Sequence, residues 1–339
     1  MLVIAENKSL KTYNTFGIAA FCPFFVEINL TEDFLALLNT DVYLKNPKLI
    51  IGGGSNILFT QNFNGLVIKN NLKGISVVFE DDNDVIVRAA AGENWHEFVL
   101  WSITKNYYGL ENLSLIPGCV GASPMQNIGA YGVEIKDVFH ELEAVDIITG
   151  EIKIFNKAAC EFGYRESVFK TKCKNKYLIT SVSFKLSKHA SLKTTYGAIH
   201  SELEAMHIHN PTAKDVSNAV ISIRQSKLPD PKITGNAGSF FKNPEISKEK
   251  YEELKNSFSD IVAYALPDGR SKLAAGWLIE QCGLKGFEIN GAAIHSKQAL
   301  VLINKNNCSG NAVFKLSSYV LQKVFDKFGV TLEREVNIF

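Results

Sequence analysis

The chain has 339 residues, of which 46% are hydrophobic and 21% are charged, a composition typical of a globular protein that excludes a disordered or fibrous one. Its formal net charge of +1 gives no electrostatic reason to expect nucleic acid or an acidic membrane surface as a partner. No apolar run reaches the roughly 18 residues that a membrane span needs, and the opening stretch MLVIAENKSL becomes charged too early for a secretory signal.

The cysteines are scattered and form no CxxC pair. This spacing argues against a zinc site and against a disulfide framework. We therefore expect reduced thiols, no metal site, no membrane insertion and a cytoplasmic location. The six residues are Cys22, Cys119, Cys160, Cys173, Cys282 and Cys308.

Short β-rich runs separated by turn residues occupy the first 70 residues. The stretch 85–90 (VIVRAA) predicts a further strand. After it the apolar residues Trp95, Phe98, Val99 and Ile103 recur at helical spacing, and Gly109 is a plausible C-cap for that helix.

Strands resume in the middle of the chain. The stretch 141–155 predicts a hairpin that turns at Thr149-Gly150, and 176–187 predicts another strand. A helix is expected over 212–226, where Thr212 and Asp215 form its N-cap. Its apolar face consists of Val216, Ala219, Val220 and Ile223, and the two prolines of KLPDP end it.

We place a domain boundary near Gln225. Beyond it, helices are predicted at 247–258 and 311–329, a buried face is predicted around Trp277, and a strand is predicted at the C-terminus. Strands and helices are mixed without a strict βαβ rhythm, which favours an α+β fold over a doubly wound sheet.

The sequence GGGSN at 52–56 is neither a GxGxxG motif, because residue 57 is isoleucine, nor a P-loop, because it lacks the lysine. Successive glycines can point several N–H groups in one direction and so bind an anion such as phosphate. They can equally form a tight turn, and this motif alone does not distinguish the two.

A second glycine-rich stretch, IPGCVGASPMQNIGAYG, spans 116–132 and has neither helical nor strand periodicity. Two long loops of small residues favour a backbone that approaches an extended ligand with several polar groups. Two unrelated connecting loops are the alternative.

A third loop, ITGNAGSFFKNP, places Ser239 between Gly238 and Phe240. A serine that follows a flexible turn beside two aromatic residues is a candidate proton donor in a dry pocket. It is not the nucleophile of a GxSxG elbow, since the flanking residues differ. Of the histidines, His295 is interpreted as structural and His96 as a surface residue.

Nine segments in this order resemble the UDP-N-acetylenolpyruvoylglucosamine reductase family, from residue 9 to the end of the chain. Each motif alone is weakly specific, whereas nine in order are strongly so. They are NTFGI (14–18), GGGSN (52–56), AGENWHEFV (91–99), the stretch 109–137, FGYRESVFK (162–170), KLPDP (227–231), GNAGSFFKNP (235–244), KLAAGWLIEQCGLKG (272–286) and LEREV (332–336).

The resemblance implies a two-lobed FAD-binding module, with lobes at 1–70 and 71–225, followed by a smaller α+β substrate domain at 226–339 whose last strand packs back on the module. It implies an enzyme that binds FAD non-covalently and uses NADPH as hydride donor. The implied substrate is UDP-N-acetylglucosamine enolpyruvate, reduced to UDP-N-acetylmuramate for peptidoglycan and hence for cell-wall biogenesis, cell shape and cell division.

The resemblance also assigns cofactor residues in the two glycine-rich loops. The first loop would cradle the FAD pyrophosphate, and the second would contact the rest of the cofactor and its isoalloxazine ring. The assigned residues are Gly52, Gly53, Gly54, Ser55, Asn56, Pro117, Gly118, Gly121, Ala122, Gln126, Asn127, Gly129 and Ala130.

Three residues match the family's catalytic groups. Arg165 of GYRES and Glu335 of LEREV would stabilise the negative charge that develops beside the substrate carboxylate, and Ser239 would donate the proton. Glu335 can help only if it is protonated or donates through a partner. It is preferred to Glu333 on the match to LEREV, in which the role of Arg334 is not evident.

Tyr196, Lys227 and Asn243 match residues that hold the substrate's diphosphate and uridine side. Tyr196 places the chain in the branch of the family whose tyrosine loop covers the sugar nucleotide, although an ordinary aromatic residue at a strand end is the alternative. Two other functions stay open: another non-covalent FAD oxidoreductase acting on a small alcohol or amine, and a sugar-nucleotide-binding protein without catalysis.

Overall fold

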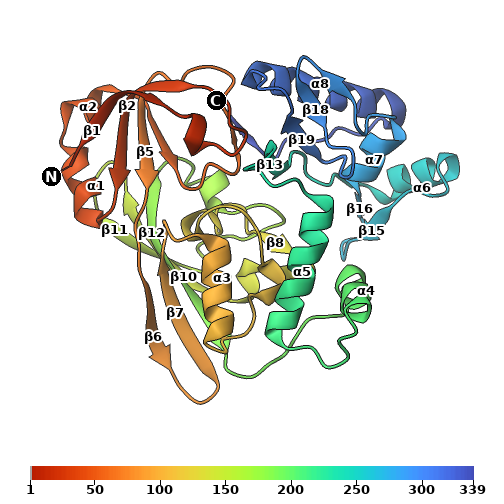
Figure 1. The fold of residues 1–339 in the computed structure, drawn as a ribbon, viewed down its shortest axis with the longest axis horizontal. Helices are drawn as coiled ribbons and strands as arrows, with labels where there is room; N and C mark the ends of the chain where they lie inside the picture. The colour runs from red at the N-terminus through yellow and green to blue at the C-terminus, as the bar shows by residue number, and fades with distance from the viewer. Residues whose placement is uncertain (1) are drawn as a thin grey trace. The chain divides into compact units, whose positions relative to one another are not determined.

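The computed structural model describes residues 2–339, so that Met1 of the opening stretch lies outside the described part. The chain forms two compact units (Figure 1). Unit 1 comprises the chain up to Lys8, Cys22–Gly53 and Asn64–Ser226, and unit 2 comprises Ser9–Phe21, Gly54–Phe63 and Lys227–Phe339. Strands and helices are mixed in both units, which confirms the α+β prediction.

A four-stranded sheet of order β1-β2-β5-β3 begins unit 1. The central strand β5 is parallel to both of its neighbours, β2 and β3. Apolar side chains of this sheet and of α1 form one core, in which Val26, Ile28, Phe34, Leu37 and Ile68 are fully buried. The elements are β1 (Ile4–Ser9), β2 (Phe21–Ile28), α1 (Thr31–Leu38), α2 (Asp41–Lys45), β3 (Lys48–Ile51) and β5 (Leu66–Asn70).

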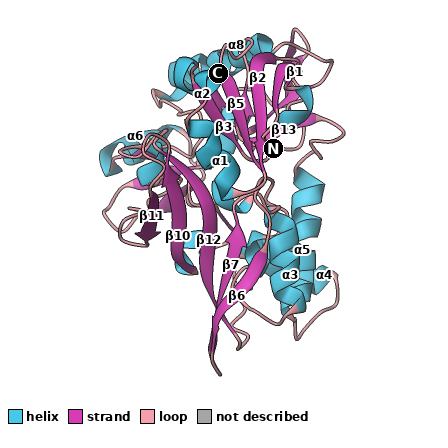
Figure 2. Cartoon of the chain, turned by 90° about the vertical axis from the view of Figure 1, so that its left-hand side faces the viewer, coloured by secondary structure: helices cyan, strands magenta, loops and turns pink. Residues whose placement is uncertain are grey.

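A five-stranded antiparallel sheet of order β11-β10-β12-β7-β6 forms the second part of unit 1 (Figure 2). The predicted hairpin at Thr149-Gly150 is confirmed, because β10 pairs with β11 across it. Helix α3 (Trp95–Thr104) packs on the sheet through Trp95 and Phe98, whose rings contact Phe184 of β12. The strands are β6 (Ile75–Glu80), β7 (Asp84–Ala90), β10 (Phe139–Asp146), β11 (Ile152–Asn156) and β12 (Tyr177–Ser187), and a short hairpin pairs β8 (Gly129–Ala130) with β9 (Val133–Glu134).

The predicted end of α3 was wrong. The helix stops at Thr104 with Lys105 as its C-cap, and Gly109 lies in a later turn with φ +121°. Asn106, with φ +57°, already leaves the helical conformation, since asparagine tolerates the left-handed region better than most residues.

The predicted helix at 212–226 is confirmed as α5 (Ala213–Lys227). The Thr212 hydroxyl accepts the Asp215 N–H, and the Asp215 carboxylate accepts the Thr212 N–H, as the capping prediction requires. The predicted apolar face is buried against α4 (Gly197–Ala205), with which it forms a small core of its own.

Unit 2 contains a four-stranded sheet of order β13-β19-β18-β17 and a three-stranded sheet of order β14-β16-β15. The predicted helices at 247–258 and 311–329 are confirmed as α6 and α8, capped at their starts by Ser247 and Ser309. The elements are β13 (Gly235–Ser239), β14 (Glu245–Ile246), α6 (Lys248–Ser257), β15 (Ala263–Ala265), β16 (Ser271–Leu273), α7 (Ala275–Gln281), β17 (Glu288–Ile289), β18 (Ala292–Ile294), β19 (Val301–Asn304) and α8 (Gly310–Phe328).

Two segments from the first 63 residues belong to unit 2. The last strand, β20 (Asn337–Ile338), pairs in parallel with β4 (Ile57–Leu58). A Cβ at Gly310 would lie 1.7 Å from the carbonyl oxygen of Phe59, so that only glycine permits this contact.

Among residues 2–339, no helix combines the length and the apolar character that crossing a membrane requires.

Candidate active site

The GGGSN loop follows β3 and passes from unit 1 into unit 2 between Gly53 and Gly54. In unit 1, the backbone of Gly53 lies directly against the second glycine-rich loop: a Cβ at Gly53 would lie 3.0 Å from Cα of Gly118. A Cβ at Gly52 would meet only the Cys119 side chain, at ordinary distances of 3.5 Å from its Cβ and 3.8 Å from its Sγ. The two glycine-rich loops are therefore packed together, backbone on backbone, and are not unrelated connections.

Gly54 is required for a different reason. Its φ of +64° is left-handed, and a Cβ there would lie 2.0 Å from the Tyr13 carbonyl oxygen. The Gly54 carbonyl accepts the N–H of Thr15 at 3.0 Å, which joins the loop to NTFGI within unit 2. Close approach of the protein's own backbone thus accounts for both Gly53 and Gly54.

The polar character of the loop nevertheless suits an anion. Among the hydrogen bonds of residues 2–339, the Gly54 N–H has no backbone carbonyl acceptor, whereas the Gly53 N–H donates to the Cys119 sulfur. Beside Gly53, burial raises the pKa of the Cys119 thiol, while the positive charges of Lys69 and Lys73 lower it. Lys73 is paired with Glu93 at 3.5 Å, so the positive charge that the loop offers a phosphate comes mainly from Lys69.

The second loop is shaped by its own packing. A Cβ at Gly121 would lie 2.5 Å from Cβ of Ala91, and one at Gly129 would lie 2.9 Å from the carbonyl oxygen of Val133. Pro117 and Ala122 are exposed, whereas Gly118, Gln126 and Ala130 are half-buried. The loop therefore presents mainly backbone and small side chains.

Asn127 has a structural position within this loop. Its side chain is fully buried and donates to the Glu134 carboxylate at 3.1 Å and to the Gly163 carbonyl at 3.0 Å. Its Oδ1 accepts the Lys136 N–H at 3.1 Å. The side chain is thus used by the protein and anchors the loop close to the GYRES segment.

Arg165 lies against the same loop. Its guanidinium donates to the Gly129 carbonyl at 3.0 Å, and its backbone has a left-handed φ of +53°, which is uncommon for arginine. The Lys170 ammonium donates to the Arg165 carbonyl at 3.2 Å and so fixes this strained turn. Unit 1 therefore brings a predicted catalytic residue together with predicted cofactor residues.

Arg224 and Tyr131 belong to this group although the sequence did not identify them. The Arg224 guanidinium on α5 donates through Nε to the Leu115 carbonyl at 3.2 Å and contacts the Tyr131 hydroxyl. Burial lowers the pKa of Arg224, Tyr131 raises it, and the positive charge of Arg165 lowers it again. Two neighbouring guanidinium groups favour an anionic ligand. Arg224 gives no local signal, since it resembles any cation near a helix end.

Tyr196 joins the group through an aromatic contact. Its side chain is 48% exposed at the start of α4, and its ring meets that of Tyr131 edge to face at 5.7 Å. The ring therefore packs next to the residue that contacts Arg224, while much of it faces solvent.

In unit 2, Ser239 is the last residue of β13 and is exposed. The pairing of β13 with β19 shifts register between Asn236 and Ser239, where Gly238 has a φ of +70° and donates its N–H to Asn236 Oδ1 at 2.9 Å. Phe240 and the residue after it are buried. The predicted loop is thus a bulged strand that directs the serine outward and the aromatic rings inward.

Glu335 lies beside this strand end. The Glu335 N–H donates to the Phe240 carbonyl at 2.9 Å, and Phe241 forms an antiparallel bridge with Arg334. The backbones of Ser239 and Glu335 are therefore neighbours within unit 2. Asn56 of GGGSN donates to the Glu335 carbonyl at 3.3 Å, which adds the end of that loop to the group.

The structure shows that Arg334, whose role was not evident from the sequence, packs against α8. Its guanidinium donates to Ser317 and Ser318 of α8 at 2.8 and 2.7 Å and lies 4.6 Å from the centre of the Phe314 ring. The exposed Glu333 carboxylate forms an ion pair at 2.6 Å with Lys242, whose side chain is largely buried, whereas Glu335 is half-buried. The assignment of the catalytic carboxyl group to Glu335 stays a prediction.

The remaining predicted substrate residues lie at helix ends. Lys227 is the exposed last residue of α5. Asn243 accepts the Ala275 N–H at 3.0 Å and so satisfies a donor at the start of α7.

The prediction that His96 is a surface residue was wrong. It is half-buried on α3, and its Nδ1 accepts the Leu115 N–H at 3.0 Å. Burial and the charge of Arg224 lower its pKa. His295 is also half-buried, and its pKa is likewise lowered by burial and by Lys297.

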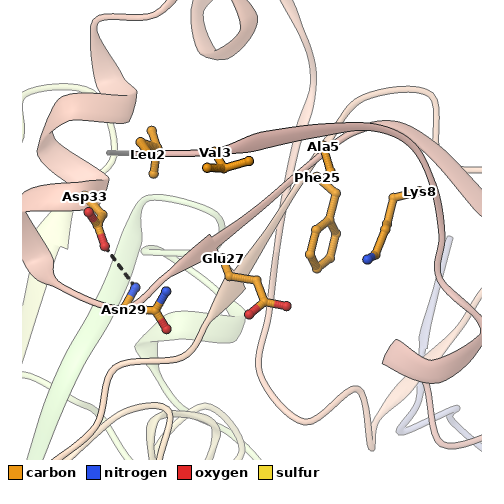
Figure 3. Close-up of a pocket in the computed structure, with 8 residues that line it drawn as sticks. All are labelled: Leu2, Val3, Ala5, Lys8, Phe25, Glu27, Asn29 and Asp33. Carbon is orange, nitrogen blue, oxygen red and sulfur yellow. Dashed lines mark hydrogen bonds between the residues drawn. The ribbon is translucent and has the colours of Figure 1, made fainter.

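A hollow of about 320 Å³ lies over β1 and β2 (Figure 3). Its lining includes Lys8, whose ammonium lies 5.4 Å from the centre of the Phe25 ring, and Asn29, whose N–H donates to Asp33 at 3.2 Å. None of the predicted site residues lines it.

Within residues 2–339, no cluster of histidine, cysteine and carboxylate side chains is arranged to hold a metal ion, and all six cysteines are free thiols.

The chain is similar in sequence and in structure to known proteins. Residues 25–156 match an FAD-binding domain, and residues 230–339 match the C-terminal domain of UDP-N-acetylenolpyruvoylglucosamine reductase. The chain is 50% identical to the UDP-N-acetylenolpyruvoylglucosamine reductase of Flavobacterium johnsoniae, covering 99% of each chain. It is also 50% identical to that of Chromobacterium violaceum, covering 98% of each.

A crystal structure of the reductase from Thermus caldophilus has the same fold, with a TM-score of 0.65 and 19% identity over 100% of this chain and 99% of the other. The sequence identities over almost the whole chain decide the family. The chain belongs to the UDP-N-acetylenolpyruvoylglucosamine reductase family.

Proposed function

We propose that the chain is an NADPH-dependent FAD enzyme that reduces UDP-N-acetylglucosamine enolpyruvate to UDP-N-acetylmuramate in peptidoglycan precursor synthesis. The observation that carries this is the 50% identity to a curated reductase over 99% of each chain. The match of residues 230–339 to the C-terminal domain of the reductase argues against the alternative, an FAD enzyme acting on a small alcohol or amine.

The residues of the two glycine-rich loops fit the cofactor. The backbone N–H groups of the GGGSN loop would hold the FAD pyrophosphate, and the positive charge of Lys69 would add to the attraction. When bound, FAD supplies the hydride that NADPH provides and the enolpyruvyl group receives. No side chain is assigned a covalent link to it.

Arg165 is proposed to bind the substrate carboxylate. Its planar guanidinium can donate two parallel hydrogen bonds to a carboxylate, and its attachment to the Gly129 carbonyl holds it in place. Arg224 increases the positive charge beside it. Preorganised positive charge of this kind stabilises the negative charge that develops next to the carboxylate when hydride adds.

Ser239 is proposed to donate the proton to the carbon that carries this charge. Its exposed position at the end of β13 leaves the hydroxyl accessible to a substrate, while the buried rings after it hold the strand end rigid. Glu335, attached through its N–H to Phe240, is proposed to orient the serine or the enolate-like group. A bare carboxylate would oppose the developing charge, so this role requires a proton or a donor between the two groups.

Tyr196, Lys227 and Asn243 are proposed to hold the sugar nucleotide. Tyr196 supports this assignment by its exposed ring at the start of α4, packed on Tyr131. The proposed compartment is the cytoplasm, where free thiols such as those of this chain remain reduced.

An absorption spectrum of the purified protein tests the function. We expect a yellow protein that releases intact FAD on acid or heat treatment. NADPH is expected to bleach the flavin, and the enolpyruvyl substrate is expected to restore its absorbance. Flavin that stays with the denatured chain, or reduced flavin that the substrate does not reoxidise, would contradict the proposal.

A further inference from the structure

Leu115, directly before the second glycine-rich loop, has an unusual backbone conformation. Its φ of +57° lies in the left-handed region, which leucine rarely adopts because its Cβ then crowds the next carbonyl. Strain of this kind persists only where the surrounding structure holds it, and it concentrates at functional sites.

Side chains from two helices hold both polar groups of this residue. The Leu115 N–H donates to Nδ1 of His96 on α3 at 3.0 Å, and its carbonyl accepts from Nε of Arg224 on α5 at 3.2 Å. A nitrogen that accepts a hydrogen bond carries no proton. The bond therefore defines a neutral imidazole protonated on Nε2.

We propose that neutral His96 is a positioning residue of the reductase, which acts through Leu115 to hold Arg224 beside Tyr131. This inference rests on the proposed role of Arg224 toward the anionic substrate. His96 itself is not assigned a contact with substrate or cofactor.

Protonation of His96 would release this arrangement. A proton on Nδ1 replaces the acceptor with a second donor facing the Leu115 N–H, and it places a positive charge near Arg224. The charged groups that act on His96 are Arg224 from α5 and Glu97 from its own helix, and burial and Arg224 lower its pKa while Glu97 raises it. Arg224 is therefore fully positioned at pH values above the ordinary pKa of histidine, and its positioning is lost as the pH falls below that pKa.

Two substitutions separate this role from simple packing. In His96→Asn, the amide oxygen occupies nearly the position of Nδ1 and accepts a hydrogen bond without titrating. His96→Leu removes the acceptor and retains an apolar body. Exposed His140 on β10 provides the control, His140→Asn.

The experiment measures, across pH 5 to 8, the KM for the enolpyruvyl substrate and the rate at which NADPH reduces FAD. His96→Leu is expected to raise the KM by roughly 10- to 100-fold at neutral pH, as for a misplaced binding group, and to leave flavin reduction within a few-fold. His96→Asn is expected to recover most of this loss and to remove the rise in KM that the wild type shows on acidification. His140→Asn is expected to match the wild type.

A second readout is independent of catalysis. In protein carrying ¹⁵N-labelled histidine, we expect the His96 signal to show an unprotonated Nδ1 and a titration midpoint below 6.5, the ordinary value. A His96→Asn enzyme with the wild-type acid dependence, or a protonated Nδ1 at neutral pH, would overturn the inference. An absence of turnover in the wild type would instead overturn the proposed function.

Discussion

Ser239 is the residue for which the two half-reactions differ most. Reduction of FAD by NADPH needs no proton from this serine, whereas reduction of the enolpyruvyl group needs one at the carbon beside the hydride. In Ser239→Ala, we expect flavin reduction within a few-fold of the wild type and reoxidation by the substrate slowed by at least ~10²-fold, the lower range for losing a positioned acid. Stopped-flow absorbance of the flavin measures each half-reaction separately.

Ser239→Cys is the matched variant, because a thiol is a better acid at the same position. It is expected to recover part of the rate lost in Ser239→Ala. The exposed end of β13 tolerates the larger sulfur atom. Fast reoxidation in Ser239→Ala would mean that the proton comes from elsewhere and that the bulge at Gly238 has only a structural role.

At the scale of the loop, the three consecutive glycines permit a graded test. A Cβ at Gly52 meets Cys119 at an ordinary 3.5 Å, one at Gly53 meets Gly118 Cα at 3.0 Å, and one at Gly54 meets the Tyr13 carbonyl at 2.0 Å with a left-handed φ. We expect Gly52→Ala to be mild. Gly53→Ala is expected to part the two loops slightly and to weaken FAD binding, and Gly54→Ala to destabilise the protein by about 1–3 kcal/mol or more through overpacking.

FAD content and thermal unfolding midpoints measure these effects. Because Gly52→Ala adds the same methyl group one residue away, it serves as the control for Gly53→Ala. Equal FAD binding in these two variants would show that contact between the loops does not shape the cofactor site.

At the scale of secondary structure, local signals predicted the elements whose start and end signals lie within the segment itself. The helix α5 was predicted from the Thr212–Asp215 cap, the apolar spacing and the following prolines, all of which lie within the segment itself. The end of α3 was missed because Asn106 ends the helix before the glycine that resembles a cap. The bulge before Ser239 was missed because it depends on pairing with the distant strand β19.

The candidate site was predictable only in part for the same reason. Ser239 was predicted as a proton donor from its local pattern as well as from the resemblance, whereas Arg165 and Glu335 were assigned by resemblance alone, since no local pattern distinguishes them. The neighbouring position of Ser239 and Glu335 depends on a bridge between residues 241 and 334. Arg224 was missed because its role arises from contacts with Leu115 and Tyr131, which are remote in sequence.

At the scale of the whole molecule, the chain is not divided at a single boundary. The last part of unit 2 starts at Lys227, two residues after Gln225, while the domain boundary expected there stays a prediction. Residues 9–21 and 54–63 also belong to unit 2, held by contacts such as the Asn304 side chain donating to the Phe16 carbonyl at 2.9 Å. Pairings between segments so far apart have no signature in either segment alone.

The stability of the whole molecule is expected to depend on pH on both sides of neutrality. His96 and His295 have a lowered pKa in the folded protein, so the unfolded chain binds protons first as pH falls below 6.5, the ordinary histidine value. The contribution of these two histidines to stability is complete above pH 6.5 and is lost as the pH falls through their pKa in the folded protein. Asp146 and Asp215, whose pKa is lowered by hydrogen bonds, add a similar loss below 3.8.

At alkaline pH, the stability of the protein falls as the pH rises. Burial raises the pKa of Cys22 from 9.0 to about 11 and that of Cys160 from 9.0 to about 12, so these thiols stay protonated in the folded protein while the unfolded chain ionises. Their contribution to stability is complete below pH 9 and is lost as the pH rises through the pKa values of the folded protein.

Thermal unfolding midpoints measured in reducing buffer are therefore expected to form a plateau from about pH 6.5 to 9 and to fall on either side. Cys160→Ala is expected to lower the plateau by leaving a small cavity and to flatten the alkaline slope, whereas His295→Asn is expected to flatten the acid slope alone. An alkaline slope that is unchanged in Cys160→Ala would show that this buried thiol does not control stability at high pH.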